Sequence, residues 1–412
     1  MQRMTDVGVA VHEGDAAWMV GIDLGRRAAH EAVLRGADGS ERGLRFAHSR
    51  EGIDGFVGEL SGLDGRVLVI LEPTATRWQA LAEEFFGGGF EVRQVHAATV
   101  AKLRSARDIT GAKSDRVDAR TLAGAMDYSY LVRPDTPAVA CAHALCLERL
   151  RLRRERRRLR TAVKACLDTI WPEFLQTFRG GEQGVTARAV IAVTGGDPAR
   201  ARRLGAQELE RRVRAAAPGR HIGHTKIKQL TQRTSRTVGY RAARIAYVAR
   251  LQRLMRRRAL IESQLAALEQ ELLGLYPRLP GAQRLCSLPG LTPLDRALLL
   301  AAAGDIRRLK SPRALGKLGG CAPIARDSGE SAPKRKIAAR CRYQLRDAAF
   351  QAARHIVRAC PAFRALYHAL RGRLTATQAL IACANRLLRV IWRMVNSDVD
   401  YNPAKVAPGL KR

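Results

Sequence analysis

The charge of this 412-residue chain is divided very unevenly along its length. Residues 1–140 hold 17 Lys and Arg against 20 Asp and Glu, whereas residues 141–412 hold 55 basic residues against 18 acidic ones. The division predicts a near-neutral module joined to a strongly basic one. The net charge of +34 favours DNA or RNA as a partner, because Lys and Arg neutralise backbone phosphates and release counterions. A membrane surface is the weaker alternative, since the basic segments lack an apolar face rich in Trp and Phe.

Hydropathy and cysteine usage predict a soluble protein that is not exported and makes no membrane contact. The longest apolar run, residues 297–303, is far shorter than the roughly 18 residues that span a bilayer. Residues 1–18 carry acidic side chains and no hydrophobic signal core. Eight cysteines without a CxxC pair suit free thiols in a reducing compartment. We therefore expect a cytoplasmic, nucleoid-associated protein.

Apolar runs and turn residues in the first third alternate as strands and helices. The expected strands are 18–24, 30–35, 43–47, 66–71 and 90–95, and the expected helices are 51–60, 77–86 and a helical region over 100–127. The order strand, strand, strand, helix, strand, helix, strand, helix matches a ribonuclease H-like (RuvC-like) α/β arrangement. In that arrangement the first strand, the fourth strand and a late helix carry the acidic residues of the site.

Four acidic residues fall at those places. Asp23 ends the first strand, Glu72 ends the fourth, and Asp115 and Asp118 lie three apart at a helix start. Acids near a helix N-terminus commonly do no more than complement the helix dipole. Four carboxylates at the expected element ends instead predict a catalytic site that holds Mg²⁺, with two ions for displacement at phosphorus. The neighbouring Lys113 and Arg116 are predicted to contact nucleic acid.

The segment Gly21–Gly25 also resembles the first phosphate loop of actin-like and sugar-kinase ATPases. Those proteins need a second Asp/Gly hairpin after an apolar strand. Asp327-Ser328-Gly329 lacks such a strand and sits among basic residues. The ATPase interpretation is therefore disfavoured.

Residues 138–279 are predicted to form long, basic coiled-coil helices. Eight arginines lie between 149 and 160, and Leu145, Leu152 and Leu159 repeat every seven residues. A second heptad seam runs from Ile261 to Leu275. Its partner is either the 143–170 helix of the same chain or a copy in another subunit. Because eight arginines repel one another, phosphate contacts are predicted at Arg153, Arg154 and Arg157.

Residues 280–397 are predicted to form an all-α C-terminal domain, followed by a disordered tail over 398–412. Residues 1–18 are likewise predicted to be a disordered leader before the 19–137 domain. A polar, Gly-containing loop at 324–331 includes Ser328, a candidate nucleophile for phosphate. A basic run follows it at once, and its predicted nucleic-acid contacts are Lys334, Arg335, Lys336, Arg340 and Arg342.

Six motifs in order resemble transposases of the insertion sequence 110 family, relatives of Piv-type invertases. They are Gly21-Ile22-Asp23, Glu72-Pro73-Thr74, residues 113–119, Leu288-Pro289-Gly290, Gly304-Asp305-Ile306 and Asp327-Ser328-Gly329. The resemblance covers about residues 19–395. It implies a DEDD set at Asp23, Glu72, Asp115 and Asp118 and a serine nucleophile at Ser328. It also implies recombination of element ends and target DNA through a phosphoserine intermediate, guided by a structured noncoding RNA and carried out by a homodimer or homotetramer.

One departure from the family pattern follows the serine. Residues 340–344 read RCRYQ where the family usually has a Lys-x-Gly-Asn-like segment, and Ser331 is a second possible nucleophile. Two other functions remain open. A metal-dependent RuvC-like junction nuclease would cut with water and form no adduct. A non-enzymatic nucleic-acid-binding protein would need neither metal nor the four carboxylates.

Overall fold

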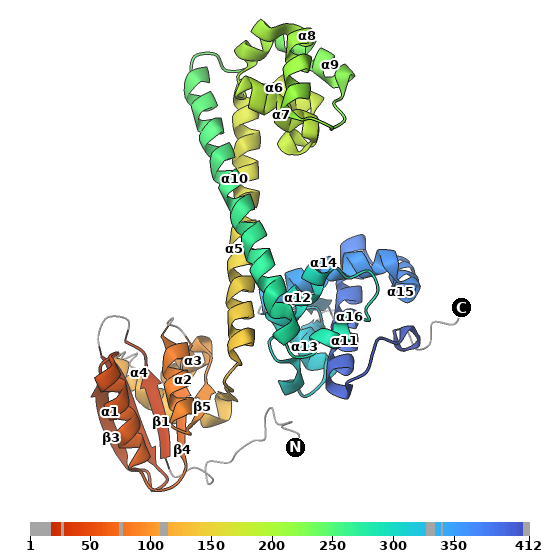
Figure 1. The fold of residues 1–412 in the computed structure, drawn as a ribbon. Coiled ribbons are helices and arrows are strands. Elements are labelled where there is room, and N and C mark those ends of the chain that lie inside the picture. The colour runs from red at the N-terminus through yellow and green to blue at the C-terminus, as the bar shows by residue number, and fades with distance from the viewer. Residues whose placement is uncertain are drawn as a thin grey trace. The chain divides into compact units, whose positions relative to one another are not determined.

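The computed structural model describes residues 18–25, 29–73, 77–107, 114–326, 334–338 and 341–406, with the backbone alone for 324–326, 334–336 and 405 (Figure 1). Contacts divide the chain into two compact units. The first comprises residues 1–140, 303–341 and 357–412, and the second comprises 141–302 and 342–356. None of the described helices is long and apolar enough to cross a membrane. The domain boundaries predicted above stay a prediction.

The first unit contains a mixed six-stranded sheet of order β3-β2-β1-β4-β5-β6. Its strands are β1 (Trp18–Asp23), β2 (His30–Gly36), β3 (Glu41–Phe46), β4 (Val67–Leu71), β5 (Glu91–Gln94) and β6 (Tyr130–Leu131). β1 pairs in parallel with β4, and β4 with β5, while the other pairs are antiparallel. The predicted order of strands and helices is confirmed, and β6 is an additional short edge strand.

Helices cover both faces of this sheet. They are α1 (Arg50–Ser61), α2 (Trp78–Gly87), α3 (Ala97–Arg107), α4 (Asp115–Ala123) and a 3₁₀ turn (Met126–Tyr128). One core joins Ile22 and Leu71 to Phe56 of α1 and Phe85 of α2. The opposite core joins Leu68 and Ile70 to Val100 of α3 and Leu122 of α4. The parallel strands β1, β4 and β5 are thus largely buried between the two layers of helices. The predicted 100–127 helical region contains two separate helices, α3 and α4.

Two long helices, α5 (Pro137–Ile170) and α10 (Arg244–Leu275), pack against each other within the chain. Their shared core contains Leu152 and Leu159 of α5 and Ile261, Leu265 and Leu268 of α10. Arg149 of α5 donates a hydrogen bond of 2.7 Å to Glu269 of α10. The seam of α10 therefore has its partner in the same chain, one of the two arrangements that the sequence left open.

A group of shorter helices packs on the end of this pair: α6 (Pro172–Thr177), α7 (Val185–Thr194), α8 (Pro198–Ala216), α9 (His224–Thr234) and a 3₁₀ turn (Gly181–Gln183) (Figure 1). We call residues 171–243 the head. Its core is built on Trp171 and Phe174, which are fully buried, together with Val163 of α5 and Leu251 of α10. The head and this end of the helix pair therefore share one core.

The remaining helices are α11 (Ala282–Leu285), α12 (Pro293–Ala303), α13 (Pro312–Leu318), α14 (Tyr343–Ala359), α15 (Pro361–Arg371) and α16 (Ala376–Ser397), with 3₁₀ turns at Tyr276–Arg278, Ile306–Arg308 and Pro403–Lys405. The prediction of an all-α C-terminal domain is wrong in one respect. An antiparallel hairpin of β7 (Pro323–Arg326) and β8 (Lys334–Ile337) flanks the candidate serine segment. These strands are short and carry no apolar alternation, so their pairing with each other rather than a local sequence pattern defines them.

The predicted disordered tail also packs further than expected. Val406 is only 1% exposed, and the Arg386 guanidinium donates to its carbonyl oxygen. The Tyr401 hydroxyl lies 3.1 Å from the sulfur of Cys360. Residues 398–406 therefore belong to the fold.

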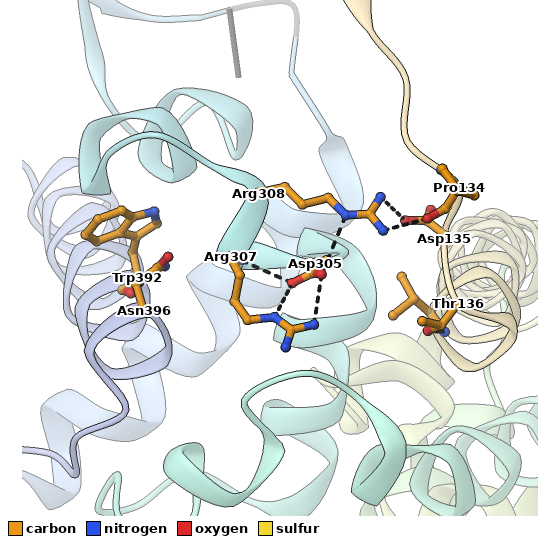
Figure 2. A network of polar contacts seen from close by, with 9 residues as sticks. Pro134, Asp135, Thr136, Asp305, Arg307, Arg308, Trp392 and Asn396 are labelled. Carbon is orange, nitrogen blue, oxygen red and sulfur yellow. Dashed lines mark hydrogen bonds and ion pairs between the residues drawn. The ribbon is translucent and has the colours of Figure 1, made fainter. Parts of the chain in front are cut away.

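The Gly304-Asp305-Ile306 motif has a structural role that Figure 2 shows. Asp305 caps the Ile306–Arg308 turn by accepting from the Arg307 backbone N–H at 3.2 Å, and it also binds the Arg307 guanidinium at 2.9 Å. Arg308 donates to the carbonyl oxygens of Arg133 and Pro134 and to Asp135, at 2.6–3.1 Å. The motif therefore fixes the segment that leads out of the sheet.

Candidate active site

The ends of β1 and β4 bring two acidic residues to the same edge of the sheet. The parallel register pairs Ile22 with Leu71, and Asp23 and Glu72 are the residues that directly follow them in the sequence. Ile22 and Leu71 are fully buried, while Asp23 and Glu72 are partly exposed. The transition from apolar to acidic therefore occurs at the carboxyl ends of parallel strands, where α/β sheets bind ligands.

α4 brings the other two acidic residues. Ser114 is its N-cap, with the side-chain oxygen accepting from the Val117 N–H at 3.2 Å, so Asp115 and Asp118 fall in the first turn. Gly21 of β1 permits the close approach of this helix. A Cβ at Gly21 would lie 2.2 Å from the carbonyl oxygen of Ala119 and from the amide nitrogen of Ala123. A side chain there would force α4 off the sheet.

The pKa of Asp23 responds to the three other predicted acids. Burial raises the pKa of Asp23 to about 6, and the negative charges of Asp115, Asp118 and Glu72 add to the rise. A carboxyl pKa is raised by like charges only when they are near. The three other predicted acids therefore lie near enough to Asp23 for their negative charges to act on it.

The described arrangement is not a closed metal cage. Asp118 forms an ion pair with Arg104 of α3, and its side chain is only 14% exposed. Across the described ranges, no group of three or more His, Cys, Asp or Glu side chains is close enough to hold one ion. Arg104 is a residue of the site that sequence reasoning missed, because its contact depends on how α3 packs on α4.

Two arginines of α4 lie along the neighbouring strand β3. The Arg116 guanidinium covers Gly43, where a Cβ would be only 3.2 Å away. Arg120 donates a hydrogen bond of 2.7 Å to Glu41. Arg116 is exposed and stays a predicted nucleic-acid contact, whereas the predicted contact Lys113 lies outside the described residues.

The serine half of the predicted site falls largely outside the described residues. Ser328 and Arg340 are among the residues left undescribed. Lys334, Arg335 and Lys336 belong to β8, where their backbones pair with Arg326, Ala325 and Ile324 of β7. Arg342 lies just before α14, where its carbonyl oxygen accepts from the backbone of Leu345. The structure does not test the role of any of them.

The basic face of α5 is partly neutralised. Arg153 forms an ion pair with Asp347, so this predicted phosphate contact is already engaged. Arg154 and Arg157 are exposed. In the described part of the chain they have no side-chain partner, nor do Arg156 and Arg158. The predicted contacts at Arg154 and Arg157 remain available to a ligand.

Comparison with known proteins places these elements in a family. Residues 20–172, which contain the four acids, match a family model for a DEDD-type transposase of IS110 elements. Residues 282–368, which contain Ser328, match a model described as transposase IS116/IS110/IS902 family. Together the matches cover more than half of the chain. The class is therefore that of transposase proteins.

Three relatives agree with this class. The chain is 34% identical over 125 residues to the "Insertion element IS900 uncharacterized 42 kDa protein" of Mycobacterium paratuberculosis, covering 30% of this chain and 31% of that protein. It is 30% identical over 142 residues to the "Insertion element IS110 uncharacterized 43.6 kDa protein" of Streptomyces coelicolor, covering 34% and 35%. It is 26% identical over 147 residues to the "Probable family 20 transposase" of Pseudomonas aeruginosa, covering 35% and 44%.

The chain belongs to the IS110 family of insertion-element transposases. The aligned stretches span about a third to less than half of these relatives' own length. The relatives therefore support the family, while substrates and partners are matters for proposal.

Proposed function

We propose that this protein is the transposase of an insertion element, and that it cuts and rejoins DNA strands with divalent cations held by Asp23, Glu72, Asp115 and Asp118. The observation that carries the proposal is the placement of the acids: Asp23 and Glu72 follow paired residues of parallel strands, and α4, with Asp115 and Asp118 in its first turn, packs directly on Gly21 of β1. The raised pKa of Asp23 agrees with this placement. The sheet supports a ribonuclease H-like assignment, because three antiparallel strands precede the parallel strands β4 and β5.

The donor set fits Mg²⁺. Carboxylate oxygens are the ligands that this cation prefers, and a positive charge among them would relieve the repulsion that burial makes costly. Two ions are proposed because four carboxylates can bridge a pair. When bound, such ions polarise a phosphate oxygen and neutralise developing charge. The chain's own part is to hold the four acids on strand ends and a capped helix, and to release Asp118 from Arg104.

Ser328 is proposed as the nucleophile. Its oxygen would form a bond to phosphorus while the phosphorus–oxygen bond to the departing strand breaks. The serine proton passes to solvent or a base, and the departing strand leaves as a hydroxyl. The phosphodiester energy is kept in the phosphoserine bond, so a hydroxyl of the partner strand can reverse the step without ATP. The position of Ser328 within the second family match, shortly before the basic run 334–336 in the sequence, supports this role.

The guide RNA and the oligomeric state are proposed from the resemblance to the family. A structured noncoding RNA from the element itself would select element ends and target, and a homodimer or homotetramer would bring two strand pairs together. The excess of 37 positive charges over residues 141–412 supports a nucleic-acid partner of either kind.

The experiment combines purified protein, Mg²⁺, donor and target DNA, and the noncoding RNA transcribed from the element itself. A covalent protein–DNA species should appear on a denaturing gel and disappear in Ser328→Ala, whereas the matched variant Ser331→Ala should keep it. Normal recombination by Ser328→Ala would refute the serine assignment. Metal-dependent cutting without any adduct would indicate the junction nuclease. Binding without Mg²⁺-dependent cutting would indicate a non-enzymatic binding protein.

A further inference from the structure

The loop between α9 and α10 exposes two apolar side chains on a basic surface. Val238 is 83% exposed and Tyr240 is 53% exposed, and Ile245 at the start of α10 is 79% exposed. We call residues 237–241 the Tyr240 loop. Single exposed apolar residues are ordinary, but neighbouring ones in a fixed geometry indicate a contact surface.

The fold holds this loop in place with a buried charge. The Glu173 side chain, in a residue only 6% exposed, accepts from the Thr237 hydroxyl at 2.8 Å and from the Val238 N–H at 3.0 Å. The Tyr240 N–H donates to the carbonyl oxygen of Thr169 at 2.8 Å. A buried carboxylate is retained only when its hydrogen bonds compensate for lost hydration. The hydrogen bonds to Glu173 therefore hold in place the loop backbone that carries the exposed Val238 and Tyr240 side chains.

Glycine at 239 is part of the same construction. A Cβ there would lie 2.1 Å from the carbonyl oxygen of Ile170, so the loop backbone is pressed against the end of α5. The Tyr240 ring also meets the Tyr247 ring edge to face, with 6.5 Å between centroids. The Tyr240 ring is thus supported on one side and exposed on the other.

The surroundings of Tyr240 are positively charged. The head carries 14 Lys and Arg against five Asp and Glu. A cavity of about 110 Å³ beside Tyr240 is lined in part by Arg202, Arg241 and Arg244. Arg244 faces Asp197 at 3.6 Å, whereas Arg202 and Arg241 are exposed and have no partner for their side chains in the described ranges. The cavity has the size and charge for a phosphate group.

We propose that the Tyr240 loop binds an unpaired nucleotide of a nucleic-acid strand, with the base stacked on Tyr240 and an adjoining phosphate held by Arg202 and Arg241. An exposed aromatic ring beside unpaired arginines is the combination that single strands require. A second copy of the head would meet this surface with charge of the same sign, and a membrane would need a broader apolar face. The proposal rests on the nucleic-acid partner of the proposed function, but not on the carboxylates or Ser328.

The test uses the full chain in EDTA with oligonucleotides that contain 2-aminopurine, whose fluorescence falls when the base stacks. Single-stranded RNA, single-stranded DNA and duplex DNA are compared. Wild type and Tyr240→Phe should quench the single strands. Tyr240→Ala should lose the quenching and bind about tenfold more weakly at high salt, with an unchanged salt dependence. Arg241→Ala should keep quenching and reduce the slope of log Kd against log salt by roughly 0.7.

The control is Tyr128→Ala, which removes an equally exposed tyrosine elsewhere (60% exposed). Quenching of the 2-aminopurine in either single strand supports the proposal. Whichever of RNA and DNA binds more tightly shows whether the loop prefers ribose or deoxyribose. Equal binding by Tyr240→Ala and Tyr128→Ala, or equal quenching with duplex, would overturn it. If wild type quenches the single strands but forms no covalent protein–DNA adduct, the result would count against the proposed cleavage chemistry and not against the Tyr240 loop. Circular dichroism of each variant checks that the helices of the head are retained.

Discussion

The strand ends of the sheet and the surface of α5 both crowd like charges, but they place them in different surroundings. Asp23 is partly buried on a rigid sheet, and its raised pKa records the repulsion from three other acids. Arg154 and Arg157 stand exposed on a long helix, where water and salt screen their repulsion. The acidic region is therefore a fixed concentration of negative charge on the sheet, and the basic region is an exposed surface on which salt screens the positive charge.

The largest effect is expected where the acidic region depends on close packing. Gly21→Ala places a methyl group 2.2 Å from two backbone atoms of α4, so the helix must shift. We expect the free energy of unfolding to fall by about 3 kcal/mol, measured by urea denaturation. The matched change Gly55→Ala lies in α1 with open space around it and should raise stability by about 0.5–1 kcal/mol. Equal stability of Gly21→Ala and wild type would disprove the tight contact.

The next effect is a pH dependence from His30 in β2. Burial, with help from His48 and Arg77, lowers the pKa of His30 to about 4. In the unfolded chain the ordinary value is about 6.5, so between these values only the unfolded state takes up the proton. The His30 contribution is complete above pH 6.5 and is lost as the pH falls toward 4.

His30→Phe should remove that loss, since the ring lies beside Phe46 at 4.9 Å. Relative to wild type, the variant should gain about 2 kcal/mol between pH 7 and pH 5, measured by denaturation at each pH. The quantity to follow is the difference in unfolding free energy between His30→Phe and wild type, because Asp23 changes the stability of both proteins in the opposite direction. Its raised pKa makes the folded state gain stability as the pH falls through about 6. A constant difference between the two proteins would contradict a neutral, buried His30.

Asp23→Asn tests the repulsion itself. Removing one of four crowded charges should stabilise the metal-free protein at pH 7 by on the order of 1 kcal/mol, after allowance for solvent screening. Thermal unfolding in EDTA measures it. Asp64→Asn, at an exposed acid elsewhere in the same domain, should change little. A lower thermal stability of Asp23→Asn than of wild type in EDTA would mean that the Asp23 carboxylate makes net favourable contacts, and would contradict repulsion among the four acids.

The smallest effect is expected on the basic surface. Replacing Arg154 and Arg157 together by Ala should leave stability within about 0.5 kcal/mol of wild type. The salt slope of binding to duplex DNA should fall by about two, one for each lost phosphate contact. The pair Arg211 and Arg212, both already bound to Glu208, provides a control with a smaller expected change. An unchanged salt slope in the Arg154 and Arg157 double variant would show that this surface of α5 does not contact DNA phosphates.

Local patterns were enough to predict the acidic region. Apolar runs that end in Asp23 and Glu72, and two aspartates three residues apart at a helix start, are signals carried by a few adjacent residues. The long helices were predictable for the same reason, because the seam at Leu152 and Ile261 has a helical period.

Features that depend on packing between distant segments were not predictable. The hairpin of β7 and β8 has no apolar alternation, and the ion pair of Arg104 with Asp118 exists only because α3 lies against α4. The exposure of Tyr240 is likewise invisible in sequence, since it depends on Glu173, more than sixty residues away. Tertiary structure, rather than propensity, decides such contacts.

The most direct test is a titration of the full chain with Mn²⁺, followed by electron paramagnetic resonance of the free ion. Mn²⁺ prefers the same oxygen ligands as Mg²⁺. We expect wild type to bind two ions, and Asp23→Asn, Glu72→Gln, Asp115→Asn and Asp118→Asn each to lose at least one of them, whereas Asp64→Asn keeps both. Binding by all four variants equal to that of wild type, or no binding by folded wild type, would contradict a shared four-carboxylate site.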